Sequence, residues 1–254
     1  MAEERICVLS IAGFDPSGGA GILADIKTFE AHKVCGMGAM SALTFQNDVE
    51  FDNVRWIEAD DILKQISMLR KRFEFTVIKI GLVQNIDAIE KIIMYFNQKP
   101  ETRNQNPFLI WDPIIKASAG FEFHKMFDRE KTFSVLKNIF LITPNTNEVK
   151  FLSGINYPIK AAEELSKYCN VLLKGGHNKK EPGIDYLFMQ NKIEKIFPTK
   201  TGIFPKHGSG CVLSSAIASN LALGNNLITS CYNAKKYIER FLSSNQTLLG
   251  VHYV

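Results

Sequence analysis

The chain has 254 residues, of which 46% are hydrophobic and 22% charged, and its formal net charge is +4. This length and composition predict a single α/β domain over residues 1–254. The basic residues are spread along the chain and no apolar stretch reaches the ~18 residues of a membrane span, so we expect neither nucleic acid nor a membrane as partner. The mixed charges of the N-terminal sequence and the scattered cysteines predict a cytoplasmic protein with reduced thiols.

Short apolar runs that end in Gly, Pro or Asn alternate with stretches of helical spacing. The predicted strands, in chain order, are ICVLSIAG (6–13), TVIKIG (76–81), FLIWDP (108–113), FLITPN (140–145) and VLLKGG (171–176). Apolar residues at helical spacing lie at 22–29, 62–69, 89–96 and 162–168. Residues 185–197 form two short alternating runs around Gln190-Asn191, which predicts a hairpin at a sheet edge. Together these elements predict a mainly parallel sheet with helices on both faces.

In such a sheet a ligand binds beyond the carboxyl ends of the strands. The first unusual segment there is GFDPSGGAG (13–21), with four glycines between a strand and a helix. Glycine lets the backbone approach a ligand closely, but the spacing fits neither a Walker A loop nor GxGxxG. Taken alone, the segment is equally compatible with a plain structural turn. Asp15 and Asp25 likewise fit a turn former and a surface charge.

HGSGC (207–211), directly before an Ala/Ser-rich helix, is a more specific signal. The first N–H groups of a helix have no internal partner and lie at the positive end of its dipole, so Gly208, Ser209, Gly210 and Cys211 can hold an anion through the backbone. The same dipole predicts a lowered thiol pKa, so that Cys211 is partly thiolate near neutral pH. The alternative is that Cys211 is a small buried hydrophobe.

Asp112 and Glu148 each follow a predicted strand. Two converging carboxylates suit Mg²⁺, which keeps water and phosphate oxygens as its other ligands. The alternative is that Asp112 caps a turn and Glu148 belongs to the first turn of a helix. Lys174, at a strand end, can neutralise a phosphate or lie in solvent as an ordinary surface charge.

Seven ordered segments are similar to the hydroxymethylpyrimidine/phosphomethylpyrimidine kinase family of thiamin biosynthesis, which is ribokinase-like. These segments are GFDPSGGAGILADIKTF, ALTFQN, KIGLV, DPIIKASAG, LITPNTNE, LLKGGH and HGSGCVLSSAIASNLALG. The resemblance covers about residues 6–240 and implies ATP-dependent phosphorylation of the hydroxymethylpyrimidine to its monophosphate and then its diphosphate. It also implies Mg²⁺ as cofactor and allows a homodimer.

The resemblance assigns roles to individual residues. Those implied to line or bind the pyrimidine are Gly13, Ala20, Asp25, Gln46, Leu82 and Ile114. Asp112 and Glu148 are implied to hold the metal, and Asn145, Lys174 and the 201–210 loop, with Ser209, the nucleotide. Gly208 and Gly210 form the implied anion hole, and Cys211 occupies the position of the general base of sugar kinases.

The sequence departs mildly from the family pattern at Leu82, Lys116, Ala119 and Ser209, and its short 197–207 loop leaves the adenine contacts unassigned. A pyridoxal kinase is the nearest alternative, because it shares the implied fold. A catalytically silent vitamin-binding protein is a second alternative, against which the joint presence of Asp112, Glu148 and Cys211 argues.

Overall fold

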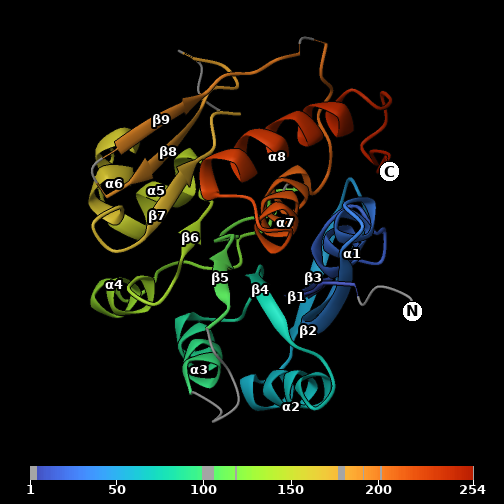
Figure 1. Cartoon of the computed structure of the whole chain (residues 1–254), viewed down its shortest axis with the longest axis vertical. Helices are drawn as coiled ribbons and strands as arrows, with labels where there is room; N and C mark the ends of the chain where they lie inside the picture. The colour runs from blue at the N-terminus through green and yellow to red at the C-terminus, as the bar shows by residue number, and fades with distance from the viewer. Residues whose placement is uncertain are drawn as a thin grey trace.

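Nine strands form one mixed sheet in the order β3-β2-β1-β4-β5-β6-β7-β8-β9 (Figure 1). The computed structural model describes residues 5–98, 106–117, 119–176, 181–190, 192–200 and 202–253. The strands are β1 (Cys7–Phe14), β2 (Cys35–Gln46), β3 (Phe51–Trp56), β4 (Phe75–Ile80), β5 (Phe108–Trp111), β6 (Leu141–Ile142), β7 (Asn170–Leu173), β8 (Asp185–Met189) and β9 (Lys192–Ile196).

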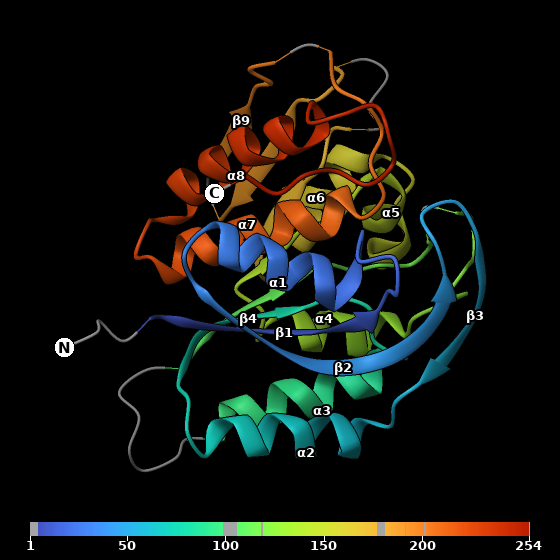
Figure 2. The same cartoon turned by 90° about the vertical axis from the view of Figure 1, so that its right-hand side faces the viewer.

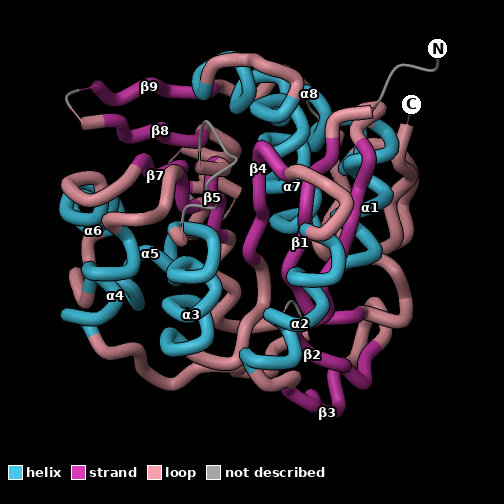
Figure 3. Tube along the Cα trace, turned by 60° about the horizontal axis from the view of Figure 1, so that its bottom comes forward, coloured by secondary structure: helices cyan, strands magenta, loops and turns pink. Residues whose placement is uncertain are grey.

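The six strands from β2 to β7 in this order run parallel, whereas β3, β8 and β9 are antiparallel to their neighbours. In Figure 3, β3 and β9 lie at opposite edges of the sheet. All five strands predicted from the sequence are present, and so is the hairpin, as β8 and β9. Asn191 of the predicted turn lies outside the described residues.

Helices cover both faces of the sheet (Figure 2). One face packs against α1 (Gly21–Ala31), α7 (Ser209–Ala222) and α8 (Leu227–Leu242). The other packs against α2 (Ala59–Arg70), α3 (Ile86–Asn97), α4 (Arg129–Leu136), α5 (Thr146–Ser153) and α6 (Pro158–Leu165). The predicted α/β fold, with a mainly parallel sheet between helices, is confirmed. Within the described part of the chain, no helix is both long and apolar enough to cross a bilayer.

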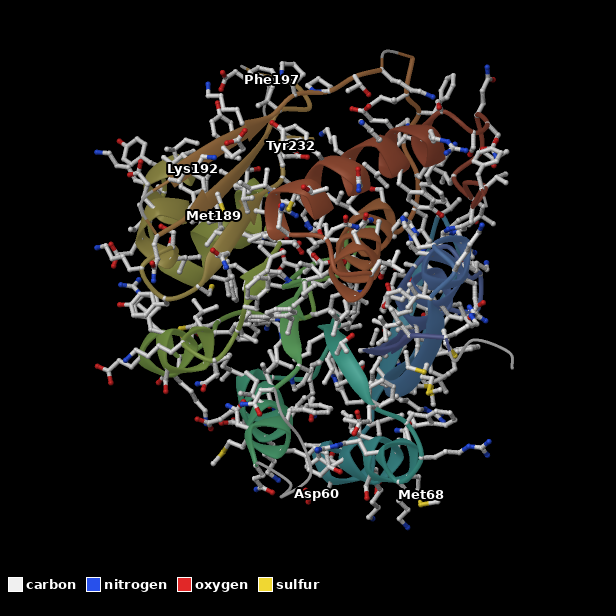
Figure 4. The ribbon with its side chains drawn as sticks, viewed as in Figure 1. Asp60, Met68, Met189, Lys192, Phe197 and Tyr232 are labelled. Carbon is white, nitrogen blue, oxygen red and sulfur yellow. The ribbon has the colours of Figure 1, made fainter. Side chains whose placement is uncertain are left out.

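The β8–β9 hairpin extends the sheet and is attached to α8. Figure 4 labels Met189 and Lys192 at its turn and Tyr232 on α8. The Tyr232 hydroxyl donates a hydrogen bond to Glu194 at 3.0 Å. Deeper in the fold, the Lys235 ammonium of α8 forms a 2.8 Å ion pair with Asp185 of β8. Polar contacts thus attach both strands of the hairpin to α8.

Candidate active site

The parallel strands end at one edge of the sheet, and the segments after them form the site. β1 continues into the glycine-rich loop 13–21, in which Gly21 has φ +58° and a Cβ added there would lie 2.1 Å from the Gly13 carbonyl oxygen. Only glycine allows this close approach. A Cβ on Gly13 would lie 3.2 Å from Leu82 Cδ2 and 3.6 Å from Thr44 Cγ2, so Leu82 and Thr44 form the adjacent wall.

Gln46 extends that wall along β2, and Ile114 lies in the segment after β5. The Gln46 amide nitrogen, at the end of β2, donates to Thr44 Oγ1 at 2.8 Å, and Thr44 Oγ1 donates to the Phe14 carbonyl oxygen at 2.7 Å. Ile114 follows β5 and lines a small hollow together with Gly81, which precedes Leu82. The structure therefore brings Gly13, Leu82 and Gln46 together, whereas Ile114 lines a separate hollow beside Gly81.

The N-terminus of α7 faces the glycine-rich loop. Gly208 is its N-cap residue, with φ +70°, and a Cβ there would lie 2.0 Å from the Gly19 carbonyl oxygen and 2.7 Å from Ala20 Cα. No side chain among the described residues caps this helix, so the N–H groups of its first turn are available to an anion. The predicted anion-binding segment thus borders Ala20.

Three charged side chains lie beside that helix terminus. The Lys174 ammonium is 2.9 Å from Asp112 Oδ1 and 3.6 Å from Glu148 Oε2. A Cβ on Gly210 would lie 3.3 Å from Lys174 Nζ and 3.8 Å from Asp112 Oδ2. The sequence-predicted metal, nucleotide and anion-hole residues therefore form one cluster.

The two carboxylates of this cluster differ in their protonation. Burial raises the pKa of Glu148 to about 7, with Lys174 opposing the shift and Asp112 adding to it. Burial alone would also raise the pKa of Asp112, but the charges of Lys174 and Lys79, together with hydrogen bonds, hold this pKa below its ordinary value. At neutral pH Asp112 carries a full charge, and Glu148 is close to its titration midpoint.

Glu148 also takes part in a helix cap. The Asn145 side chain accepts hydrogen bonds from the N–H groups of Asn147 and Glu148, and Glu148 Oε2 accepts from the Asn145 N–H at 2.6 Å. The capping arrangement considered as the alternative for Glu148 is thus present. It fixes one carboxylate oxygen and orients the group toward Lys174.

The donor set fits Mg²⁺. Asp112 and Glu148 approach the same ammonium nitrogen, so their oxygens converge on one small volume. Among the described residues there is no group of three or more His, Cys, Asp and Glu side chains that would enclose a metal. Mg²⁺ needs only one or two carboxylates when phosphate and water oxygens complete its shell.

Cys211 lies in the first turn of α7 with its side chain 5% exposed. Burial raises the pKa of its thiol to about 11, and the opposing effects of the Lys79 ammonium and the Gly21 N–H are smaller. The predicted partial thiolate is therefore wrong, because removing the sulfur from water outweighs the favourable charges. The thiol is protonated at neutral pH.

Asp25 is fully buried inside the fold. Its fully buried carboxylate accepts from Lys79 Nζ at 2.7 and 2.8 Å, and also from the hydroxyls of Ser10 and Ser215. Asp25 is therefore not among the residues that we propose to contact the substrate. Lys79 went unnoticed in the sequence, where the signal was a single lysine inside the otherwise apolar strand TVIKI.

Sequence reasoning also overlooked polar residues that support the cluster. Asp112 Oδ1 accepts from Thr143 Oγ1 at 2.9 Å, and Asp112 Oδ2 accepts from Ser214 Oγ at 3.3 Å. His207 and Asp15, 2.8 Å apart, connect the two glycine-rich segments. Thr201 of the predicted nucleotide loop lies outside the described residues.

Comparison with known proteins places this geometry in a family. The family model for phosphomethylpyrimidine kinase matches residues 15–253. The chain belongs to the phosphomethylpyrimidine kinase family. This confirms the predicted family and its ribokinase-like fold, and with them an ATP-dependent kinase of thiamin biosynthesis acting on hydroxymethylpyrimidine and its phosphate.

Individual relatives agree with this membership. The chain is 32% identical over 255 residues to a hydroxymethylpyrimidine/phosphomethylpyrimidine kinase from Aquifex aeolicus, covering 94% of this chain and 95% of the relative. The crystal structure of a phosphomethylpyrimidine kinase from Clostridium difficile matches with a TM-score of 0.76 and 31% identity, over 92% of this chain and 98% of that one. A Bacillus subtilis pyridoxal kinase in an ADP complex matches with a TM-score of 0.80 and 27% identity, over 96% and 94%.

Proposed function

We propose that the α7 N-terminus holds the phosphoryl group that passes from ATP to the hydroxymethylpyrimidine. The observation that carries this proposal is the closeness of Gly210 to both Lys174 and Asp112. The N–H groups from Ser209 to Cys211 would then stabilise charge on the transferred group, while Lys174 neutralises phosphate oxygens. Positioning and charge stabilisation are the main requirements of phosphoryl transfer.

The pyrimidine is proposed to bind between the glycine-rich loop and β2. Gly13, Ala20 and Leu82 would contact the ring, with Ile114 closing the apolar side. Because the Gln46 amide nitrogen donates to Thr44, its carbonyl oxygen remains available to accept from the amino group of the ring.

Asp112 and Glu148 are proposed to hold Mg²⁺, with Asn145 orienting Glu148 through the helix cap. The metal, when bound, neutralises charge on the ATP phosphates. Lys174 lies between the two carboxylates and would turn toward the phosphates, which compete with those carboxylates for its ammonium. Ser209 would contact the nucleotide through its backbone.

The Cys211 thiol is proposed to face the acceptor hydroxyl as a neutral group. With a pKa of about 11 it orients that hydroxyl instead of removing its proton as a standing thiolate. The second step, whose acceptor is a phosphate monoester, needs little deprotonation. Cys211→Ala should therefore lower kcat for hydroxymethylpyrimidine by about 10- to 100-fold and for its monophosphate by much less. Equal, near-native kcat for both substrates would show that Cys211 does not orient the acceptor hydroxyl.

The function is tested by ATP consumption with Mg²⁺ and hydroxymethylpyrimidine, with products resolved by mass. A diphosphate product supports both steps. Pyridoxal assayed in parallel tests the second candidate, which the similarity to the B. subtilis pyridoxal kinase favours. Turnover of pyridoxal alone would identify the protein as a pyridoxal kinase. The absence of turnover with either substrate would favour a vitamin-binding protein without catalytic activity.

We also propose a single domain that works in the cytoplasm, where ATP is supplied, and that pairs as a homodimer. One unbroken sheet spans the described elements, which supports a single domain. The exposed apolar side chains of Phe45 and Val49, near the β2–β3 turn, support pairing. Light scattering of the purified protein tests the dimer.

A further inference from the structure

A buried hydrogen bond connects the two glycine-rich segments of the site. His207 Nε2 lies 2.8 Å from Asp15 Oδ2, and the two side chains are 5% and 1% exposed. Asp15 belongs to loop 13–21 on the pyrimidine side. His207 directly precedes Gly208 on the phosphate side. The bond therefore spans the boundary between acceptor and donor.

Asp15 organises its own loop with the same carboxylate. Its Oδ2 also accepts from the Ala20 N–H at 2.8 Å, and its Oδ1 accepts from the Ser17 N–H at 2.9 Å. A shift of Asp15 would therefore move the backbone of Ala20, a proposed pyrimidine contact. The imidazole thus reaches the substrate loop through one shared oxygen atom.

The imidazole itself is held from the other side. A Cβ on Gly19 would lie 2.7 Å from His207 Cδ2 and 2.7 Å from Leu249 Cδ2, so the ring fills the space beside the loop. The His207 N–H donates to the Leu248 carbonyl oxygen at 2.9 Å. Lys206, one residue earlier, donates to the carbonyl oxygens of Asn245 and Thr247. Residues 245–249 therefore support the position of the ring.

The hydrogen atom of this bond can be assigned to the histidine. Burial alone would raise the pKa of Asp15, but the hydrogen bonds from His207, Ser17 and Ala20 outweigh burial and leave the pKa below its ordinary value. The carboxylate is therefore ionised and acts only as an acceptor. Nε2 must then carry the hydrogen. Nδ1 is buried and makes no hydrogen bond to any described residue. Of the two ring nitrogens, Nε2 is the one that connects the loops.

We propose that His207 is a positioning residue for phosphoryl transfer, which fixes the pyrimidine loop to the anion-hole loop through Nε2 and Asp15. The inference rests on the proposed roles of Ala20 and Gly208. The transferred phosphoryl group and the pyrimidine ring that carries the acceptor oxygen are bound by different loops, so their alignment depends on this connection. Small displacements of reacting groups reduce rates steeply.

Two amide substitutions separate the ring nitrogens. In His207→Gln the side-chain amide nitrogen takes the place of Nε2 and can still donate to Asp15, whereas in His207→Asn it takes the place of Nδ1 and cannot reach. We expect H207Q to keep kcat and the KM for hydroxymethylpyrimidine within about threefold of native. H207N should lower kcat and raise that KM, each by about tenfold or more.

His32 supplies the matched control. It is a half-buried imidazole at the other end of α1, whose Nδ1 lies 2.8 Å from the Thr28 carbonyl oxygen. H32Q and H32N should leave the KM for hydroxymethylpyrimidine unchanged. A folding defect lowers the fraction of active enzyme and hence kcat, but it leaves KM as it was, so the KM change separates positioning from stability.

Several results would overturn the proposal. An H207N protein with native KM and kcat would show that the bond aligns nothing, and an active H207N beside an inactive H207Q would assign the role to Nδ1. Should H207N fail to fold, Asp15→Ala, which removes the acceptor oxygen, takes its place, with the same expected rise in KM and the same native-like result counting against the idea. Native enzyme that fails to phosphorylate hydroxymethylpyrimidine would instead refute the proposed function.

Discussion

Gly208 shows how a single missing side chain shapes the anion site. Its φ of +70° and the Gly19 carbonyl oxygen 2.0 Å from the Cβ position both exclude a side chain. We expect Gly208→Ala to lower kcat by about 100-fold or more, because the loops must separate. Gly224 is the matched control, since it has φ +85° with open space around it. Gly224→Ala should cost only about 1–3 kcal/mol of backbone strain and keep kcat, as urea unfolding and steady-state assays would show.

Cys211 should react slowly with alkylating reagents at neutral pH. A thiol with a pKa of about 11 is almost wholly protonated there. The rate of iodoacetamide modification, followed by mass spectrometry, should rise about tenfold per pH unit up to about pH 9, and the signal should be absent in Cys211→Ser. A rate that reaches a plateau near pH 7 would show that Cys211 is a thiolate at neutral pH after all.

Glu148 makes stability depend on pH. Because its pKa rises from 4.5 to about 7 on folding, the folded chain holds a proton in that window that the unfolded chain has lost. The contribution of Glu148 to the free energy of unfolding therefore falls as pH rises through this window. Glu148→Gln should gain stability relative to native between about pH 5 and 8, measured by urea unfolding. Glu130→Gln, at an exposed carboxylate, should show no such trend.

At the scale of elements, the Asp185–Lys235 pair joins β8, the strand next to the β9 edge, to α8. Both side chains are buried, and Asp185 Oδ1 also accepts from the Gly175 N–H at 2.7 Å. Lys235→Met should destabilise the fold by about 3–5 kcal/mol, because it leaves a buried charge without its partner. The double variant Lys235→Met/Asp185→Asn, which also removes the charge, should lose less than half as much in urea unfolding. Equal losses would mean that only the lysine packing matters.

Whether an element could be predicted depended on how regular the pattern of apolar and polar residues along it is. β4, with apolar residues at four of its six positions, was predicted, because a strand buried on both faces is rich in apolar side chains. β2 was missed because Gly36 and Gly38 interrupt its pattern. A Cβ on Gly38 would lie 2.3 Å from Ile22 of α1, so this glycine serves a packing contact that no local pattern records. β3 was missed because its exposed edge carries polar side chains.

The same distinction holds for the site. Asp112, Glu148 and Lys174 could be brought together from the sequence because each follows a strand of one parallel sheet. The partner of Asp25 could not, because Lys79 lies within a strand instead of after one. The Asp15–His207 bond could not either, because it depends on how two loops fold against each other. The thiol of Cys211 was misjudged because its burial is a property of the folded chain.

At the scale of the whole molecule, a single domain should unfold in one step. Trp56 and Trp111 lie in β3 and β5, so tryptophan fluorescence reports on these two parts of the sheet. Far-ultraviolet circular dichroism reports on the secondary structure of the whole chain. The two thermal transitions should coincide. A nonhydrolysable ATP analogue at about a hundredfold excess over its Kd should raise both midpoints together by about 5–10 °C. Two separate thermal midpoints would show that the chain contains two independently unfolding domains.

The bond between Asp15 and His207 also sets the order in which a newly made chain becomes competent. The two residues are 192 positions apart, and the loop around Asp15 is translated first. At about 5–20 residues per second, the ribosome needs roughly 10–40 s to reach the histidine. β1, α1 and β2 can associate during that interval, but the catalytic loops meet only near the end of synthesis. A nascent chain can therefore pack the core on the α2–α6 face of the sheet before it can gain support from bound nucleotide or vitamin precursor.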